Sequence, residues 1–515
     1  MCVRHVDDSF VSHEYLLDII ELPGLTAREI SKALLCVLEE TVGIDRLVAQ
    51  SYDGASVMSG SAGGVQALVS SSVGRKVIYV HCFAHRLHLV VLKVLQTSSH
   101  VTWLLDTCQQ LYNFFRRYSV AREYSEVGGR TLKRIMEQRW SGHHDSLSTV
   151  LVEFHNIVQT LNAIATTRTP EAIEAAGLEN QLKHEDFLPV LRETKEILDM
   201  LMPLNMAFQS EKVDIASGLI MIDEVRSHLS ELVCKLQEQD EDGGDGDVDE
   251  QHACGLQTVE VAATSYGSDA TGNSVVAEPT ASRRSSRITL RPKRLDDYVV
   301  DLEMKRLNQL FDQRSELSQD EDVDKPTEKT SPSNTECFSA KKLKLMLVQS
   351  VLSELEHRFG TSQRAVYIAA ASLASNNFSV ETLEPLVKAA QDAGVHIDCD
   401  MLSHEIPIAR AVLSREETSH THHSVLAACA SRLHPPSHPN LLLLYRFAMT
   451  MAMDTAEAER SFSTVKRILS DYRRSMTHER LRHLTVLSHE KRVLKTLSVE
   501  DFLSAFKRRS RRLLI

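Results

Sequence analysis

The chain has 515 residues, of which 43% are apolar and 5% aromatic, with 58 Lys and Arg, 70 Asp and Glu and a formal charge of −12. This length allows about two to four domains and a sizeable core. The negative balance excludes a protein that coats nucleic acid with its whole surface, so any DNA contact must use a local basic patch. We find no apolar run of roughly 18 residues and no signal or transit pattern, and therefore expect a soluble intracellular protein with no membrane contact.

Nine cysteines are scattered along the chain, and none forms a C-x-x-C pair. Such a distribution is typical of free thiols in a reducing compartment, and we expect most of them to be buried.

Residues 1–90 alternate short apolar runs with helical patterns. We expect strands at Cys2–Val6, Tyr15–Leu22, Leu47–Tyr52 and Lys76–Cys82. Thr26 and Glu29 form a capping box for a helix that Gly43 closes, and a short helix is expected around Gly64–Ser72. The order strand, strand, helix, strand, helix, strand predicts an α/β layer.

The apolar period is helical from about residue 85 to residue 206, and again after residue 340. The expected helices are His85–Thr97, His100–Tyr118, Ala340–Phe359, Val380–Gln391, Asn440–Met453, Glu457–Tyr472, Glu479–Leu494 and a last one capped by Ser498 and Asp501.

Residues 238–340 differ in composition, with two acidic stretches rich in Gly, Ser, Thr and Pro. They cannot bury enough apolar surface to offset the entropy of ordering, so we expect disorder, apart from a short helix near Asp296–Gln313. Between the acidic stretches lies a basic run that favours nuclear import over direct phosphate binding: Arg283, Arg284, Arg287, Arg291, Lys293 and Arg294. We therefore expect nuclear localisation.

Four blocks of sequence resemble the transposase-like proteins of the hAT superfamily. They are Ser51–Gly60, Val80–His88, Gln138–Ser141, and Thr455–Ser463 followed by Arg474-x-Met-x-x-x-Arg-Leu481. The likeness is closest to domesticated vertebrate members related to zinc-finger MYM-type and BED-type proteins. The blocks anchor roughly the first 145 and the last 90 residues of the chain.

The resemblance implies a ribonuclease-H-like layer interrupted by a long α-helical insertion, which is an α/β plus all-α fold. It divides the chain into a transposase core (1–145), an insertion in two parts (146–237 and 341–435), a linker (238–340) and a C-terminal dimerisation region (436–515). In that family three carboxylates hold two magnesium ions for DNA strand transfer. The second carboxylate falls on Asp53 and the third on Glu459, with Cys82, His85, Arg139 and Trp140 as active-site neighbours.

Without the resemblance, these two acids have ordinary interpretations. Asp53 and Gly54 form a common turn pair, and Glu459 is a solvated helix carboxylate. The first family carboxylate belongs on a strand before the one that Cys2–Val6 matches. We therefore expect an incomplete, N-terminally truncated layer in which the two carboxylates cannot bridge two magnesium ions, so that no cofactor is bound and no transposition occurs.

Cys82, His85 and His88 offer three zinc ligands at regular spacing, but no fourth ligand is evident. We expect no metal site, and interpret His85 as an active-site neighbour or a core histidine. Trp140 has two open interpretations: an aromatic face near DNA ends, as in the family, or a core aromatic at a helix end.

The C-terminal region carries three apolar stripes, marked by Leu443 and Phe447, by Phe462, and by Leu481 and Leu484. Helices of this kind close onto a second copy or onto the chain's own core, and the resemblance favours a homodimer. The basic tail Lys507–Arg512 suits DNA contact, nuclear import or a solvated helix end. No zinc-finger spacing occurs.

These observations predict a transposase-derived nuclear protein that is catalytically inactive and acts through dimerisation, with DNA-associated regulation. One alternative is a metal-dependent DNA transposase or nuclease whose complete N-terminus lies outside this chain. The other is a decayed reading frame without a selected function.

Overall fold

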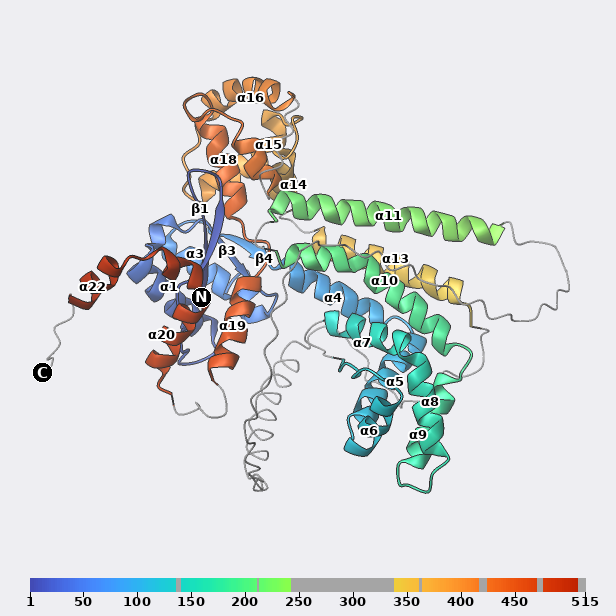
Figure 1. Cartoon of the computed structure of the whole chain (residues 1–515). Helices are drawn as coiled ribbons and strands as arrows, with labels where there is room; N and C mark the ends of the chain where they lie inside the picture. The colour runs from blue at the N-terminus through green and yellow to red at the C-terminus, as the bar shows by residue number, and fades with distance from the viewer. Residues whose placement is uncertain are drawn as a thin grey trace, which may run out of the picture. The chain divides into compact units, whose positions relative to one another are not determined.

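The computed structural model describes residues 1–135, 140–210, 213–241, 338–360, 364–415, 424–469 and 476–507. They belong to one compact unit, Met1–Asp240 with Thr330–Ile515, apart from Glu241, which falls in a second unit, Glu241–Lys329. The described part is mostly helical, with two short sheets (Figure 1). The expected disorder, the helix near Asp296–Gln313, the basic run and nearly all of the basic tail lie outside the described residues.

The N-terminal strands β1 (Cys2–Val6) and β2 (Ser12–Leu16) form an antiparallel hairpin in which Arg4 faces Glu14. The Asp7 carboxylate closes the turn by accepting from the backbone N–H groups of Ser9 and Val11, both at 2.9 Å. The strand expected at Tyr15–Leu22 was wrong in position. Because the hairpin turn sets the register, β2 begins as soon as the turn ends and ends opposite Cys2.

The second sheet pairs β3 (Ala49–Tyr52) with β4 (Ile78–His81) in parallel. Between them run α2 (Ser56–Ser59) and α3 (Val65–Val73), and α1 (Ala27–Thr41) packs against α3. The capping box of Thr26 and Glu29 is confirmed, and Gly43 follows the helix with φ 83°. Among the described residues no hydrogen-bonded ladder joins the two sheets.

A long helical region follows β4 and contains the largest core cluster. Helix α13 (Ala340–Phe359), with the bounds expected, packs against α4 (Phe83–Leu95) and α10 (Phe187–Phe208), far earlier in the chain (Figure 1). The other helices are α5 (Ser99–Phe115), α6 (Tyr118–Glu126), α7 (Ser141–Val152), α8 (Phe154–Ala165), α9 (Ala172–Leu182) and α11 (Ile215–Glu241). Helical segments before and after residues 242–337 thus share one core.

Helix α18 (Pro439–Thr450) is buried on several sides, as its apolar sequence predicted. It packs against β1 and against α15 (Val380–Asp392), α16 (Cys399–Leu413) and α17 (Val425–Ala430), while α14 (Arg364–Ser372) packs on α15. The Glu405 carboxylate, 2% exposed, accepts from the backbone N–H groups of Asn440 and Leu441 at 3.2 and 2.8 Å. This buried cap orients the first turn of α18.

The C-terminal helices are α19 (Ala456–Ile468), α20 (His478–His489), α21 (Lys491–Thr496) and α22 (Val499–Lys507). The single helix expected at Glu479–Leu494 is broken at Glu490, which ends α20 and precedes α21. The physical reason is a tertiary contact, because the Glu490 carboxylate accepts from the Leu16 N–H at 2.6 Å and ties this point to β2.

The expectation that most cysteines are buried was wrong. Of the seven cysteines in the described segments, Cys82 and Cys108 are buried, Cys36, Cys234 and Cys399 are exposed, and all seven are free thiols. The exposed cysteines lie on outer helix faces. The helical spacing of apolar residues in the sequence does not by itself show which face is buried. No helix within the described ranges is both long and apolar enough to span a bilayer.

Candidate functional site

Three distant segments meet where β4 leads into α4. The Cys82 N–H donates to the Tyr52 carbonyl at 3.0 Å, and the Phe83 N–H donates to the Met453 carbonyl at 2.7 Å. The Thr455 hydroxyl donates to the Cys82 sulfur at 3.5 Å. The end of β3 and the start of α19 are therefore held on either side of the first turn of α4.

This junction brings together Asp53, His85 and Glu459. Asp53 follows β3, and its backbone carbonyl accepts from the Tyr79 hydroxyl at 3.0 Å. Burial lowers the pKa of His85, while the charges of Asp53 and Glu459 act in the opposite direction. Both carboxylates are therefore close enough to act on one imidazole ring, although they lie 406 residues apart in sequence by their numbers.

A line of histidines runs along this junction. The rings of His81 and His85 are 5.6 Å apart, those of His85 and His88 are 6.3 Å apart, and the backbone N–H of Trp140 donates to His88 Nδ1 at 3.3 Å. Burial, followed by the positive charge of Arg86, lowers the pKa of His81 to about 4. The His81 and His85 rings are therefore neutral at physiological pH.

Trp140 is 2% exposed and belongs to the main core cluster, so its ring is covered in this structure. Arg139 lies outside the described residues. Cys82 is 1% exposed, and burial raises the pKa of its thiol. Its sulfur is therefore held as a neutral thiol rather than as a metal-binding thiolate.

The two carboxylates do not fit a two-magnesium centre. Across the described segments, one group of ligand-type side chains has all its ligand atoms within 4.8 Å of one another, and it consists of Glu457, His489 and Glu490. Asp53, Glu459 and the Cys82–His88 series belong to no such group.

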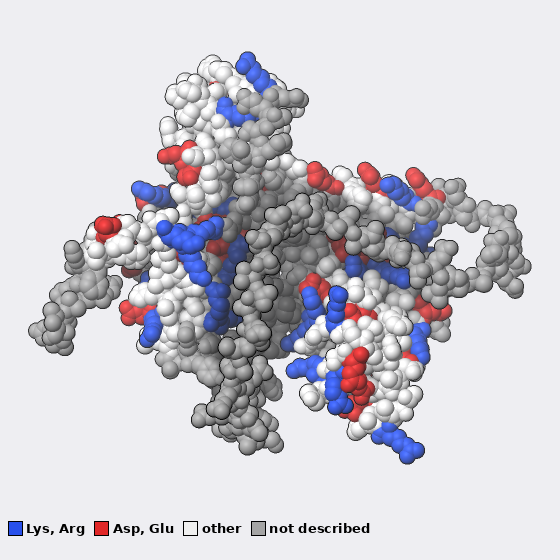
Figure 2. Space-filling model, viewed as in Figure 1, with Lys and Arg blue, Asp and Glu red and all other residues white. Residues whose placement is uncertain are grey.

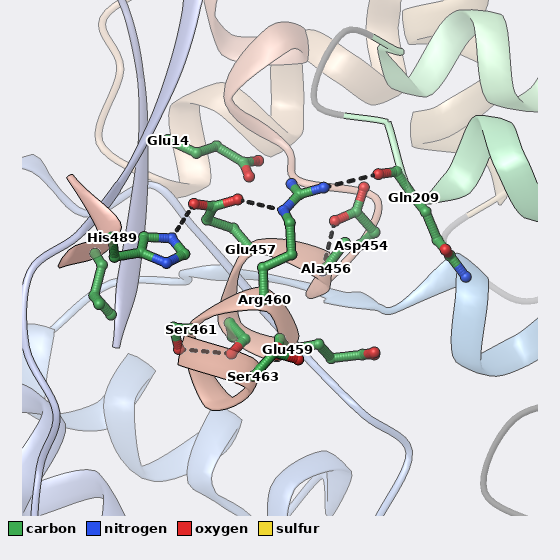
Figure 3. Close-up of polar contacts among 12 residues, drawn as sticks. Glu14, Gln209, Asp454, Ala456, Glu457, Glu459, Arg460, Ser461, Ser463 and His489 are labelled. Atoms are coloured by element: carbon green, nitrogen blue, oxygen red, sulfur yellow. Dashed lines mark hydrogen bonds and ion pairs between the residues drawn. The ribbon is translucent and has the colours of Figure 1, made fainter. Parts of the chain in front are cut away.

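Glu457 and His489 lie on the opposite side of α19 from Glu459 (Figure 3). One carboxylate oxygen of Glu457 pairs with His489 Nε2, and the other accepts from Arg460 Nε at 2.7 Å. The Arg460 guanidinium also donates to the Gln209 carbonyl at 3.2 Å. Sequence reasoning missed this group because Glu457 lies 32 residues before His489 and no local spacing links the two.

The residues expected to mediate dimerisation differ in burial and fall into three classes. Phe447 is 3% exposed and fills the core, whereas Phe462 is 61% exposed and Leu443 is 37% exposed. Leu481 and Leu484 are half-buried. Helix α22 adds further exposed apolar side chains: Val499, Phe502 and Leu503.

Charge is unevenly distributed on the face drawn in Figure 2. Basic side chains gather close to the position of α19, whereas acidic and basic side chains alternate over α6 to α9. Lys466 and Arg467, in the last turn of α19, are exposed and near the negative end of the helix dipole.

Comparison with known families identifies a family match in the C-terminal part of the chain. Residues 412–490 match the model of the hAT family C-terminal dimerisation region. The match begins within α16, ahead of residue 436 where the sequence placed the region, and it ends at Glu490. It supports hAT-family membership, a transposase-related origin and self-association of the chain.

Proposed function

We propose that this protein is a transposase-derived homodimer that works through its C-terminal region and does not catalyse DNA strand transfer. The observation that carries the proposal is the match to a dimerisation region over residues 412–490, which coincides with exposed apolar side chains on α19 and α20.

The proposed dimer surface is centred on Phe462, whose ring is exposed on α19, and on Leu487, which is 47% exposed on α20. The two helices pack against each other, so their exposed faces belong to one structural unit. Aromatic side chains at the centre of an interface contribute disproportionately to its free energy of association.

Catalytic inactivity is supported by the ligand geometry at the first turn of α4. Asp53 and Glu459 act on the same imidazole, yet no third carboxylate in the described segments completes a ligand group with them. A ribonuclease-H-like ancestry is supported by the parallel pair β3 and β4 with its helical crossover, followed by a long helical region.

A nuclear location and DNA-associated regulation are the remaining parts of the proposal. They are supported by the run Arg283–Arg294 in the sequence and by the basic surface near α19. Arg and Lys on a local patch bind phosphates by a salt-dependent mechanism, which suits an acidic protein.

Light scattering after size-exclusion chromatography tests the dimer. We expect twice the mass of the 57.8 kDa chain for the wild type and a monomer for Phe462→Glu. The matched control is Ile173→Glu, since Ile173 is 87% exposed on α9 and distant in sequence from the matched region. A monomeric wild type at micromolar concentrations would contradict the proposal.

Metal-dependent strand transfer is a second candidate function, favoured by the convergence of Asp53 and Glu459 on His85. Incubating the full chain with labelled DNA ends and Mg²⁺ or Mn²⁺ separates the two functions. We expect no product, whereas product formation that Asp53→Asn abolishes would establish the enzyme.

A further inference from the structure

The group formed by Glu457, His489 and Glu490 joins three parts of the fold. Glu457 lies in the first turn of α19, while His489 and Glu490 end α20. Their ligand atoms lie within 4.8 Å of one another, which a single metal ion can bridge after small side-chain movements. Glu490 also accepts from the Leu16 N–H at 2.6 Å, so the β1–β2 hairpin borders the group.

Two members of the group, Glu457 and His489, are shielded from water, and Glu457 is pre-oriented. Glu457 is 7% exposed and the His489 side chain 9% exposed. Arg460, itself held on the Gln209 carbonyl, occupies one oxygen of Glu457 and directs the other toward His489 (Figure 3). In metal sites, hydrogen-bond partners that do not themselves bind the metal fix the orientation of a ligating carboxylate in this way.

The donor chemistry distinguishes this group from a plain acidic cluster. It combines an imidazole nitrogen with carboxylate oxygens, a ligand set that suits zinc better than magnesium or calcium. One turn before His489, Thr485 is fully buried, and its hydroxyl has no hydrogen-bond partner in the described ranges. Residues four apart share a helix face, so this orphaned hydroxyl lies on the same side of α20.

We propose that Glu457, His489 and Glu490 bind a Zn²⁺ ion, with a water molecule as the fourth ligand. His489 binds the ion through a neutral imidazole, and any proton that it carries in its pair with Glu457 passes to solvent. The ion cross-links α19 and α20 and fastens the N-terminal hairpin to them. This inference is independent of the proposed dimer and of DNA binding.

Calorimetric titration of the chelator-treated, full-length protein with Zn²⁺ tests the proposal. We expect one high-affinity ion per chain and a rise in the thermal unfolding midpoint, because a ligand that binds only the folded state stabilises it. Loss of one ligand in His489→Ala or Glu490→Gln should weaken binding by about tenfold or more. The control His483→Ala removes an exposed histidine from the same helix and should bind as the wild type does.

Circular dichroism shows whether each variant is folded. If His489→Ala does not fold, Glu490→Gln serves as the test. Co²⁺ substitution gives a second readout, since a tetrahedral cobalt spectrum that His489→Ala removes would place the ion at the proposed ligands. No Zn²⁺ binding at micromolar concentrations, or equal binding by folded His489→Ala and Glu490→Gln, would overturn the proposal.

Discussion

Glu457 and Glu459 lie two residues apart on α19 but face opposite sides of the helix (Figure 3). Residues two apart on an α-helix are separated by about 200° around the axis. Glu457 is therefore buried against His489 and Arg460, whereas Glu459 is exposed and acts on His85. Glu457 thus packs against α20, whereas Glu459 faces the junction with α4.

Replacing Glu457 and Glu459 separately by Gln should have unequal effects on stability. Glu457→Gln leaves Arg460 and His489 without their carboxylate, and removing one partner of a buried ion pair costs about 3 kcal/mol. Glu459→Gln should change the free energy of unfolding by about 0.5 kcal/mol or less, as is usual for a surface position. Urea denaturation of the two variants measures the difference, and equal destabilisation would contradict the opposed orientation.

The cap on α18 should be equally measurable. Glu405→Ala leaves the buried N–H groups of Asn440 and Leu441 without their acceptor, so we expect a loss of about 2–4 kcal/mol. Glu384→Ala, at an exposed position of α15, is the matched control and should be close to neutral. Chemical denaturation checks both, and a control as damaging as Glu405→Ala would show that the effect is not due to the cap.

Gly54 has no room for a side chain. A Cβ there would lie 2.5 Å from Cε1 of His81, whereas a Cβ at Gly63 would meet nothing within 4 Å. Gly54→Ala should therefore cost about 1–3 kcal/mol of overpacking and shift the titration of His81, which NMR can follow. Gly63→Ala should be neutral or slightly stabilising. A Gly54→Ala protein with wild-type stability and an unchanged His81 titration would be inconsistent with this packing.

Asp454 should make stability depend on pH. Burial, followed by the charge of Glu14, raises the pKa of Asp454 to about 6, above its usual 3.8. The folded state then binds more protons than the unfolded state between these values, so stability falls as pH rises through this window. Asp454→Asn keeps the oxygen that accepts from the Ala456 N–H at 2.8 Å.

We therefore expect Asp454→Asn to stabilise the protein by about 1–3 kcal/mol at pH 7 and to have little effect at pH 4. Thermal unfolding midpoints measured from pH 4 to pH 7 check this. A variant whose advantage does not grow with pH would show that Asp454 ionises as freely in the folded protein as in the unfolded one.

The same measurements across pH should reveal His81 with the opposite sign. Its pKa is about 4 in the folded protein against 6.5 in a free chain, so the unfolded state binds more protons between these values. This contribution rises with pH and opposes that of Asp454, and His81→Gln should remove it. The double variant with Asp454→Asn separates the two contributions.

Local signals in the sequence determined most of the helices and the helix caps. Helix α13 has the bounds expected, and Thr26 and Ser498 cap their helices, because capping and apolar period involve residues only a few positions apart. The near-continuous apolar sequence of α18 likewise predicted its burial.

Other features depended on contacts between distant segments, which no local pattern records. The register of β2 depends on a hairpin turn, and the break at Glu490 depends on Leu16, more than 470 residues away. The division of the apolar stripes into the buried Phe447 and the exposed Phe462 depends on which neighbours cover each helix face.

The candidate site shows the same division. The sequence alone identified Asp53, His85 and Glu459 as residues of interest by their resemblance to a family pattern, and the tertiary structure brought them to one junction through the hydrogen bond between Phe83 and Met453. Only the tertiary structure revealed Glu457, His489 and Glu490 as a group, because ligand geometry depends on distances in space and chain folding sets these independently of sequence separation.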